Sequence, residues 1–96
     1  MIIAIDYDGT YDRDPAAWDK AILALQDTAT IICVTSRTEE QGQPVLSSIG
    51  KVVGTAHCIF AGRKWKRDAA KEAGFEVDVW IDDMPATIER QLLIGQ

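Results

Sequence analysis

The chain has 96 residues, a length typical of one domain, so we expect residues 1–96 to fold as a single unit. Hydrophobic residues make up 47% and charged residues 26%, which is the composition of a globular domain and excludes a disordered segment. Ten basic and fifteen acidic residues give a net charge of −5, which argues against non-specific binding to nucleic acid or to an anionic membrane. No apolar run reaches the ~20 residues of a membrane span. Asp6 and Asp8 interrupt the first apolar run too early for a signal peptide.

The first half of the chain predicts two buried strands separated by a helix. Residues 1–5 are almost continuously apolar, as expected for a strand that is buried on both faces of a parallel sheet. Asp14 followed by Pro15 fits the N-cap and the first position of a helix. One face of this helix carries an apolar stripe made of Trp18, Ala21, Ile22 and Leu25. A second apolar run, residues 31–34, predicts the next strand.

The second half of the chain repeats the alternation of helix and strand. The expected elements are a short helix over 45–49, a strand over 58–60, a helix over 64–73, a strand over 77–81, and a final helix that starts at Pro85 and carries Ile88 and Leu92 on one face. The breaks between them fall at Gly42, Pro44, Gly50, Gly54, Gly62 and Gly74. Four strand–helix units in 96 residues average about 24 residues each, the size of a compact βα unit. We therefore predict an α/β fold with a mainly parallel sheet.

Polar side chains follow three of the predicted strands at the point where each strand ends. They are Asp6 and Asp8 after the first strand, Thr35 and Ser36 after the second, and Asp82 and Asp83 after the fourth. The carboxyl ends of parallel strands border the ligand crevice of an open α/β sheet, so we expect these groups at one edge. Four Asp side chains in one crevice repel each other unless a cation lies among them, and oxygen ligands suit Mg²⁺. The alternative is that Asp and Gly after a strand form only a turn.

The sequence at these strand ends resembles that of the haloacid dehalogenase (HAD) superfamily in its phosphatase form. Residues 6–10, Asp-Tyr-Asp-Gly-Thr, resemble the first motif, and Thr35 at the end of an apolar run matches the second. A Lys at the start of the helix before the last strand matches the third motif, and the pair 82–83 matches the double-aspartate form of the fourth. The motifs keep the family's order over residues 1 to about 85. The resemblance implies a three-layer Rossmann-like sandwich with strand order 3-2-1-4, and no segment between the motifs is long enough for a cap domain.

The resemblance also implies a role for each residue of the site. Asp6 would be the nucleophile that forms an aspartyl-phosphate, and Asp8 would be the general acid and base, with its pKa raised by a neighbouring carboxylate. Mg²⁺ would be held by Asp6, by the main-chain carbonyl of Asp8 and by Asp83, with Asp82 acting through metal-bound water. The residues implied for phosphate binding are Thr35, Ser36, Lys66, Gly9 and Thr10. Of these, Gly9 would permit the tight turn and Thr10 would orient the loop.

Two lysines, Lys64 and Lys66, lie at the start of the predicted third-motif helix, and we predict that Lys66 is the one that acts in the site. The basic run 63–67 also contains Trp65, so it could form a nucleic-acid patch with an aromatic ring for stacking. The other interpretation is that Trp65 shares a helical stripe with Ala69 and packs in the core. We predict core packing for Trp65.

Several other side chains have simpler interpretations. Arg37, directly after Thr-Ser, could reach a substrate or pair with a nearby carboxylate, and the sequence leaves both open. His57 is expected in a loop or at a strand edge, and Trp80 in the core or half-buried. Cys33 and Cys58 are too few and too far apart for a disulfide framework or a metal knuckle, so we expect reduced core residues and a cytoplasmic protein.

Together these features predict a Mg²⁺-dependent phosphatase with an open site and no membrane association. Its substrate would be a phosphorylated small molecule, such as a nucleotide, or a nucleic-acid end. The alternative is a non-catalytic phosphate- or metal-binding module with a role in assembly or regulation, because the cap is absent and the flap after residues 6–10 is short. A receiver-like signalling domain fits less well, since its acidic pair would follow the first strand and not the fourth. An open crevice is also compatible with a homodimer.

Overall fold

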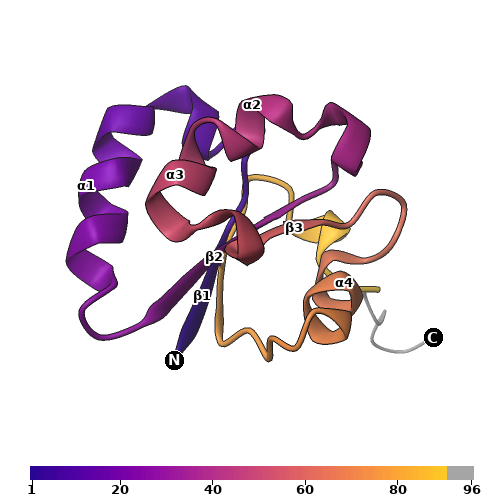
Figure 1. The fold of residues 1–96 in the computed structure, drawn as a ribbon. Helices are drawn as coiled ribbons and strands as arrows, with labels where there is room; N and C mark the ends of the chain where they lie inside the picture. Colours follow the sequence, from indigo (N-terminus) through magenta and orange to yellow (C-terminus); the bar gives the residue numbers. More distant parts are fainter. Residues whose placement is uncertain (91–96) are drawn as a thin grey trace.

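A computed structural model describes residues 1–90 of the chain, and its centre is a four-stranded, all-parallel sheet (Figure 1). The strands are β1 (Ile2–Ile5), β2 (Thr30–Thr35), β3 (Cys58–Phe60) and β4 (Val79–Ile81), and their order in the sheet is β3-β2-β1-β4. The helices are α1 (Pro15–Leu25), α2 (Gln43–Leu46), α3 (Ile49–Val53) and α4 (Lys66–Glu72). This arrangement confirms the predicted α/β fold and strand order, and no cap domain interrupts the part of the chain that the structure describes.

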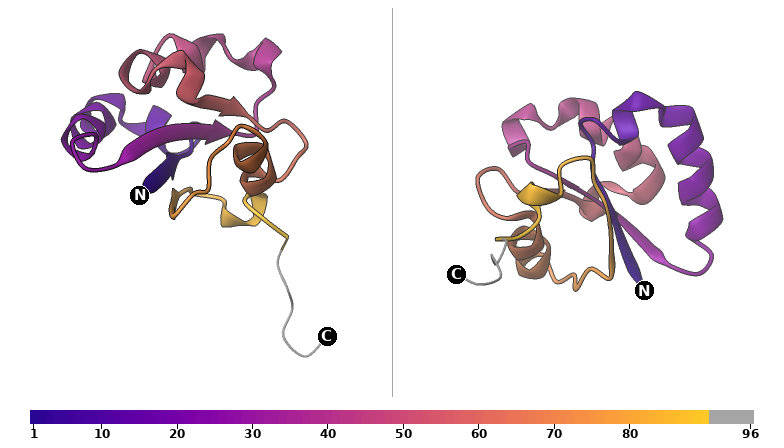
Figure 2. Two further views of the ribbon diagram at one scale, coloured as in Figure 1. Left: turned by 60° about the horizontal axis from the view of Figure 1, so that its bottom comes forward. Right: turned by 180° about the vertical axis from the view of Figure 1, so that it is seen from behind.

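Helices cover both faces of the sheet, so that β1 and β2 are buried on each side (Figure 2). Ile3 and Ile5 of β1 belong to the core cluster beneath α1 and α3, whereas Ala4 between them belongs to the cluster beneath α4. The same alternation occurs in β2, where Cys33 faces one cluster and Val34 faces the other. Burial on both faces explains why these two strands are continuously apolar in sequence.

The register of the sheet brings the ends of β1 and β4 to the same level. Ile5 pairs with Cys33 on one side and with Ile81 on the other. Beyond the strand, the backbone N–H of Asp6 donates a hydrogen bond of 2.9 Å to the carbonyl oxygen of Ile81. The residues that follow β1 and β4 therefore start from neighbouring positions at one edge of the sheet.

Helix α1 has the N-terminus and the buried face that the sequence predicts. Asp14 is its N-cap and accepts a hydrogen bond of 3.2 Å from the N–H of Ala17, while Pro15 occupies the first turn. Ile22 is fully buried in the core, and Trp18 packs partly buried against the same cluster. The apolar stripe thus fixes which face of α1 meets the sheet.

The prediction of a single short helix over 45–49 is wrong, because the chain forms two helices, α2 and α3, in this region. Gly50 lies inside α3, where the sequence predicts a break. A Cβ atom on Gly50 would lie 3.3 Å from the carbonyl oxygen of Val45 and 3.5 Å from the sulfur of Cys58. The glycine therefore allows close packing of α3 against its neighbours rather than ending the helix.

The helix expected over 64–73 is shorter than predicted, and the core packing predicted for Trp65 is wrong. Trp65 precedes α4 in an extended conformation (φ −63°, ψ 137°) and is 42% exposed. Because its backbone is not helical, Trp65 does not share the buried face of Ala69 and Ala70, which pack against the sheet. The exposed indole instead lines a surface pocket.

The C-terminal region differs from the sequence prediction in two respects. Strand β4 begins at Val79 rather than at residue 77 and forms one edge of the sheet. After it, Pro85–Thr87 form a 3₁₀ turn followed by the buried Ile88, where the sequence predicts the start of an α-helix. Leu92, expected on the same helix face, lies outside the described residues.

The remaining core and loop residues follow their predictions. Cys33 and Cys58 are buried, free thiols. His57 ends a 3₁₀ turn and lies edge-on to the ring of Phe75, with 5.5 Å between ring centroids. Trp80 is partly buried against the core cluster beneath α4. Among residues 1–90, no helix has the length and apolar character needed to cross a membrane.

Candidate active site

Three carboxylates gather where β1 and β4 end, and we call Asp6, Asp82 and Asp83 the acidic cluster. One oxygen from each lies within 4.8 Å of the others. Asp6 is 5% exposed, whereas Asp83 faces solvent. The hydrogen bond from Asp6 to Ile81 holds the two strand ends together at this point. The predicted convergence of these acidic residues is therefore present in the fold.

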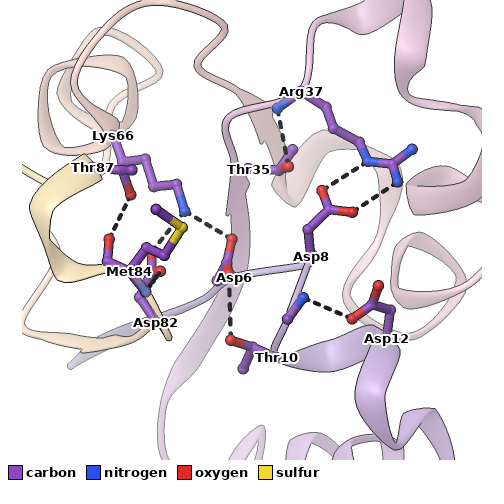
Figure 3. A network of polar contacts seen from close by, with 11 residues as sticks. Asp6, Asp8, Thr10, Asp12, Thr35, Arg37, Lys66, Asp82, Met84 and Thr87 are labelled. Atoms are coloured by element: carbon purple, nitrogen blue, oxygen red, sulfur yellow. Dashed lines mark hydrogen bonds and ion pairs between the residues drawn. The ribbon is translucent and has the colours of Figure 1, made fainter.

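Lys66 is the cation of the acidic cluster (Figure 3). Its side chain is almost fully buried, and its Nζ donates hydrogen bonds of 2.8 Å to Oδ1 of Asp6 and 2.6 Å to Oδ2 of Asp82. Lys64, the other candidate, forms an exposed pair of 2.6 Å with Glu72 on α4. Of the two lysines at the helix start, Lys66 is thus the one that reaches the strand ends.

The electrostatics of the acidic cluster leave an excess of negative charge. Burial raises the pKa of Asp6 to about 6, and the nearby Asp83 and Asp82 act in the same direction, while the hydrogen bond from Lys66 opposes them. Burial disfavours the charged form of Lys66, yet its bonds to two carboxylates raise its pKa above the usual value. When every group is ionised, three carboxylates and one ammonium sum to −2. A divalent cation would balance this charge.

The oxygens of the acidic cluster that fit such a cation belong mainly to Asp6 and Asp83. Both oxygens of Asp82 accept hydrogen bonds, one from Lys66 and one of 2.8 Å from the N–H of Met84. Among residues 1–90, Oδ2 of Asp6 accepts one long hydrogen bond, of 3.3 Å, from the hydroxyl of Thr10. Carboxylate oxygens alone are a donor set typical of Mg²⁺, so the residues present fit the predicted metal.

The loop after β1 places its backbone directly against the acidic cluster. Gly9 has a φ of +85°, and a Cβ atom at this position would overlap the carboxylate of Asp83. The N–H of Gly9 donates a hydrogen bond of 2.8 Å to Oδ1 of Asp12, a residue that no sequence motif singles out. The positive φ favours glycine here, and a Cβ atom would also displace the exposed carboxylate of Asp83.

Asp8 points away from the acidic cluster and into the planar fork of Arg37 (Figure 3). Nε and Nη2 of Arg37 each donate a hydrogen bond of 2.8 Å to one oxygen of Asp8, and Nη1 donates one of 3.0 Å to the carbonyl oxygen of Gln41. The guanidinium also lies over the ring of Tyr7, 5.1 Å from its centroid. The hydrogen bonds from Arg37 lower the pKa of Asp8, opposite to the shift expected from a neighbouring carboxylate. The sequence leaves two roles open for Arg37, and in the structure it pairs with a carboxylate, that of Asp8.

Thr35 and Ser36 lie at the end of β2 but face different surroundings. Thr35 is completely buried, and its Oγ1 accepts a hydrogen bond of 3.2 Å from the N–H of Arg37. Ser36 is exposed. The loop turn at Thr35 therefore orients Arg37, and Ser36 is the member of the pair that a ligand can reach.

Two pockets open among the loops at this edge of the sheet. The larger, about 560 Å³, is lined by Asp8, Arg37, Glu40, Gln41 and Pro44. The smaller, about 190 Å³, is lined by Ser36, Gly62, Arg63, Lys64, Trp65, Ala86 and Thr87, and we call it the Trp65 pocket. The second pocket is not predicted from the sequence, because the helical spacing assigns Trp65 to the core.

Comparison of the chain with protein-family models, curated proteins and solved structures finds no match in any of the three. A buried carboxylate paired with an ammonium, two further carboxylates, and a nearby aspartate on a glycine-containing loop are suited to binding a divalent cation and to phosphoryl transfer.

Proposed function

We propose that the protein is a Mg²⁺-dependent phosphatase of the HAD type, which hydrolyses phosphomonoesters through Asp6. The observation that carries the proposal is the buried Lys66, which bonds Asp6 and Asp82 at once while Asp83 lies within reach of both. Ion pairs buried to this degree are costly, and strongly perturbed groups of this kind concentrate at functional sites. An ionised carboxylate is already a nucleophile and needs no neighbouring base.

The proposed reaction proceeds in two displacements. A carboxylate oxygen of Asp6 attacks the phosphorus atom while the bond from phosphorus to the leaving oxygen breaks, and Asp8 gives that oxygen a proton. Water then attacks the phosphorus atom of the aspartyl-phosphate and loses a proton to Asp8. The bond between phosphorus and Asp6 breaks, which releases inorganic phosphate and restores both aspartates.

The other groups of the site have supporting roles in this proposal. The carboxylates of Asp6 and Asp83 and the main-chain carbonyl of Asp8 would hold Mg²⁺, which when bound offsets the negative charge of the phosphoryl group. Lys66 lowers the repulsion between the Asp6 carboxylate and the incoming phosphate, because it already neutralises one oxygen of Asp6. The exposed Ser36 would contribute its backbone to phosphate binding.

A second function is favoured by the pair between Asp8 and Arg37. Asp8 can donate a proton only after it leaves this fork, because two charge-assisted hydrogen bonds keep it ionised. A protein in which Asp8 stays in the fork would bind metal and phosphate without turnover. That behaviour describes the non-catalytic module that the sequence left as an alternative.

Hydrolysis of an aryl phosphate, measured with and without Mg²⁺, separates the two functions. We expect turnover that needs the metal and that falls at least a thousandfold in Asp6→Asn, with an unchanged circular dichroism spectrum. Asp27→Asn, in the exposed turn after α1, is the matched control and should keep full activity. A folded wild type that binds Mg²⁺ without turnover would favour the non-catalytic module, and wild-type activity in Asp6→Asn would refute the assignment of the nucleophile.

The compartment and the oligomeric state belong to the same proposal. The buried free thiols of Cys33 and Cys58 support a reducing compartment, and the cytoplasm is the one that the sequence predicts. A second copy of the chain over the open site would exclude water during phosphoryl transfer, as a cap would. Sedimentation at catalytic concentration tests whether such a dimer exists.

A further inference from the structure

We propose that the Trp65 pocket binds the base of a nucleoside monophosphate, so that the protein selects nucleotides among phosphomonoesters. The inference rests on the proposed function and adds the substrate class to it. It starts from an observation that the sequence does not predict, namely that Trp65 is outside the core. Because Trp65 is exposed and not packed in the core, its indole is free to stack on a ligand.

Trp65 presents a large aromatic surface from a fixed backbone position. Its side chain is substantially exposed and lines the pocket, while its carbonyl oxygen accepts a hydrogen bond of 3.0 Å from the N–H of Ala69 in the first turn of α4. Exposed indoles stack well on nucleobases, because every base has a π-face and the contact tolerates different sequences. The position of Trp65 therefore suits a planar ligand.

Backbone hydrogen bonds hold the loop between β3 and Trp65 in place. The N–H of Ala61 donates to the carbonyl oxygen of Thr35 at 2.8 Å, and the N–H of Gly62 donates to that of Arg37 at 3.3 Å. Within the loop, the N–H of Lys64 donates to the carbonyl oxygen of Ala61 at 3.0 Å. These bonds tie one wall of the Trp65 pocket to the end of β2, so the pocket is formed before a ligand arrives.

The Trp65 pocket adjoins the acidic cluster through two pairs of consecutive residues. Trp65 lines the pocket, and the next residue, Lys66, reaches Asp6 in the cluster. On β2, Thr35 is buried at the strand end, and the next residue, Ser36, lines the pocket. Consecutive Cα atoms are only ~3.8 Å apart, so the pocket and the acidic cluster border the same two backbone segments. In the proposed complex, one small molecule places its phosphoryl group at Asp6 and a ring system against Trp65.

Arg63 supplies the pocket with a cation that is not used elsewhere in residues 1–90. The other basic residues of the run each contact a carboxylate: Lys64 pairs with Glu72, Lys66 with Asp6 and Asp82, and Arg67 with Glu89. Arg63 lines the pocket and forms no such pair within the described chain. A guanidinium can donate to the ring nitrogens and carbonyl oxygens of a base or stack on its face.

Size and charge favour a single nucleotide over a nucleic-acid strand. The pocket volume of about 190 Å³ lies below the roughly 300 Å³ at which ligand pockets usually begin, which leaves space for one ring system. A net charge of −5 opposes a polyanionic strand, which needs several basic contacts along its backbone. A nucleoside monophosphate requires only one stacked base and one phosphoryl group.

The decisive experiment compares AMP with ribose 5-phosphate, which has the phosphoryl group on the same sugar carbon but lacks the base. We expect kcat/KM to be at least tenfold higher for AMP in the wild type. Trp65→Ala should reduce the AMP value by about tenfold to a hundredfold and leave ribose 5-phosphate unchanged. Trp65→Phe, which keeps an aromatic face, should retain most of the preference. Equal kcat/KM values for AMP and ribose 5-phosphate in the wild type would overturn the proposal.

Binding measurements separate failure of this inference from failure of the proposed function. If no phosphate ester is hydrolysed, calorimetric titration of AMP and of ribose 5-phosphate still tests the pocket. Tighter binding of AMP that Trp65→Ala abolishes would support the pocket and refute the phosphatase. AMP bound no more tightly than ribose 5-phosphate would refute the pocket. A 5′-phosphorylated oligonucleotide preferred tenfold over AMP would refute the mononucleotide and assign the pocket to a nucleic-acid end.

Discussion

Lys66 carries its charge in a place from which water is almost excluded. The residue is 2% exposed, and its ammonium is held between the carboxylates of Asp6 and Asp82. A buried ion pair of this kind adds little net stability when it is intact, but removal of one partner leaves a charge with no compensation. Lys66 therefore matters to the fold as well as to the proposed chemistry.

Replacement of Lys66 by Met keeps an unbranched side chain, one atom shorter, and removes the charge. We expect Lys66→Met to lower the free energy of unfolding by about 3–5 kcal/mol, because Asp6 and Asp82 lose their shared cation. Lys64→Met is the matched control, and the loss of its exposed pair with Glu72 should cost less than about 1 kcal/mol. Urea denaturation at pH 7 measures both, and equal midpoints for the two variants would contradict the buried pair.

Asp6 gives the stability of the metal-free protein a distinct pH dependence. Its pKa is raised from 3.8 to about 6 mainly by burial, so the folded state binds this proton more tightly than the unfolded state does. The stabilisation from the neutral carboxyl group is complete below pH 3.8 and is lost as the pH rises through 6. At pH 7.5 the ionised Asp6 therefore opposes folding by about 1–3 kcal/mol.

Asp6→Asn should consequently raise the melting temperature at pH 7.5 in EDTA by several degrees, since Lys66 keeps its bond to Asp82. The difference between the variant and the wild type should shrink toward pH 4. Added Mg²⁺ should stabilise the wild type and not the variant. Melting curves at both pH values, with and without the metal, measure these effects. A wild type that melts above Asp6→Asn in EDTA at pH 7.5 would contradict this account of Asp6.

At the scale of an element, the loop after β1 depends on Gly9 for two separable reasons. Gly74 after α4 has a similar positive φ of +95°, but a Cβ there would have no neighbour within 4 Å in the described part of the chain. A Cβ on Gly9 would overlap the carboxylate of Asp83. Gly74→Ala therefore incurs conformational strain alone, about 1–2 kcal/mol. Gly9→Ala should incur the same strain, and because its Cβ displaces the exposed carboxylate of Asp83 it should also weaken Mg²⁺ binding at least fivefold. Urea denaturation and metal titration of the two variants separate strain from contact.

The elements that the sequence predicts well are those buried on both sides. β1 and β2 are continuous apolar runs in the sequence because Ala4 and its neighbours pack into two different core clusters, one on each face of the sheet. The start of α1 is predictable from Asp14 and Pro15. The break predicted at Gly50 is wrong because, in sequence alone, a glycine needed for close packing cannot be distinguished from a glycine that ends a helix. The prediction for Trp65 is wrong because helical spacing does not show that the helix starts at Lys66, two residues later than predicted.

For the candidate site, the sequence predicts which residues meet but not how each one is paired. The convergence of Asp6, Asp82 and Asp83 follows from parallel strand ends, and the choice of Lys66 over Lys64 agrees with the geometry. The sequence leaves open whether Arg37 reaches a substrate or pairs with a carboxylate, because residue spacing does not predict the direction of a side chain in a loop. In the structure Arg37 pairs with Asp8. The roles assigned to these residues stay predictions until turnover is measured.

At the scale of the whole molecule, the two cysteines report on the integrity of the sheet. Cys33 and Cys58 are neighbours in β2 and β3, and burial raises the pKa of the Cys58 thiol to about 11 and that of Cys33 further. We expect neither thiol to react appreciably with a disulfide reagent at pH 8 in the native protein, and both to react at once in urea. Rapid native reaction would mean that β3 opens from β2 without global unfolding.

The acidic cluster is assembled from segments that lie far apart in the sequence. Asp6 follows the first strand, whereas Asp82 and Asp83 follow the last described strand, a three-residue segment that pairs with β1 alone. During synthesis the ribosome therefore releases Asp6 more than seventy residues before the carboxylates that complete its surroundings. An incomplete nascent chain contains the proposed nucleophile without the rest of the cluster, so it would be unable to attack phosphate esters in the cell before β4 has docked.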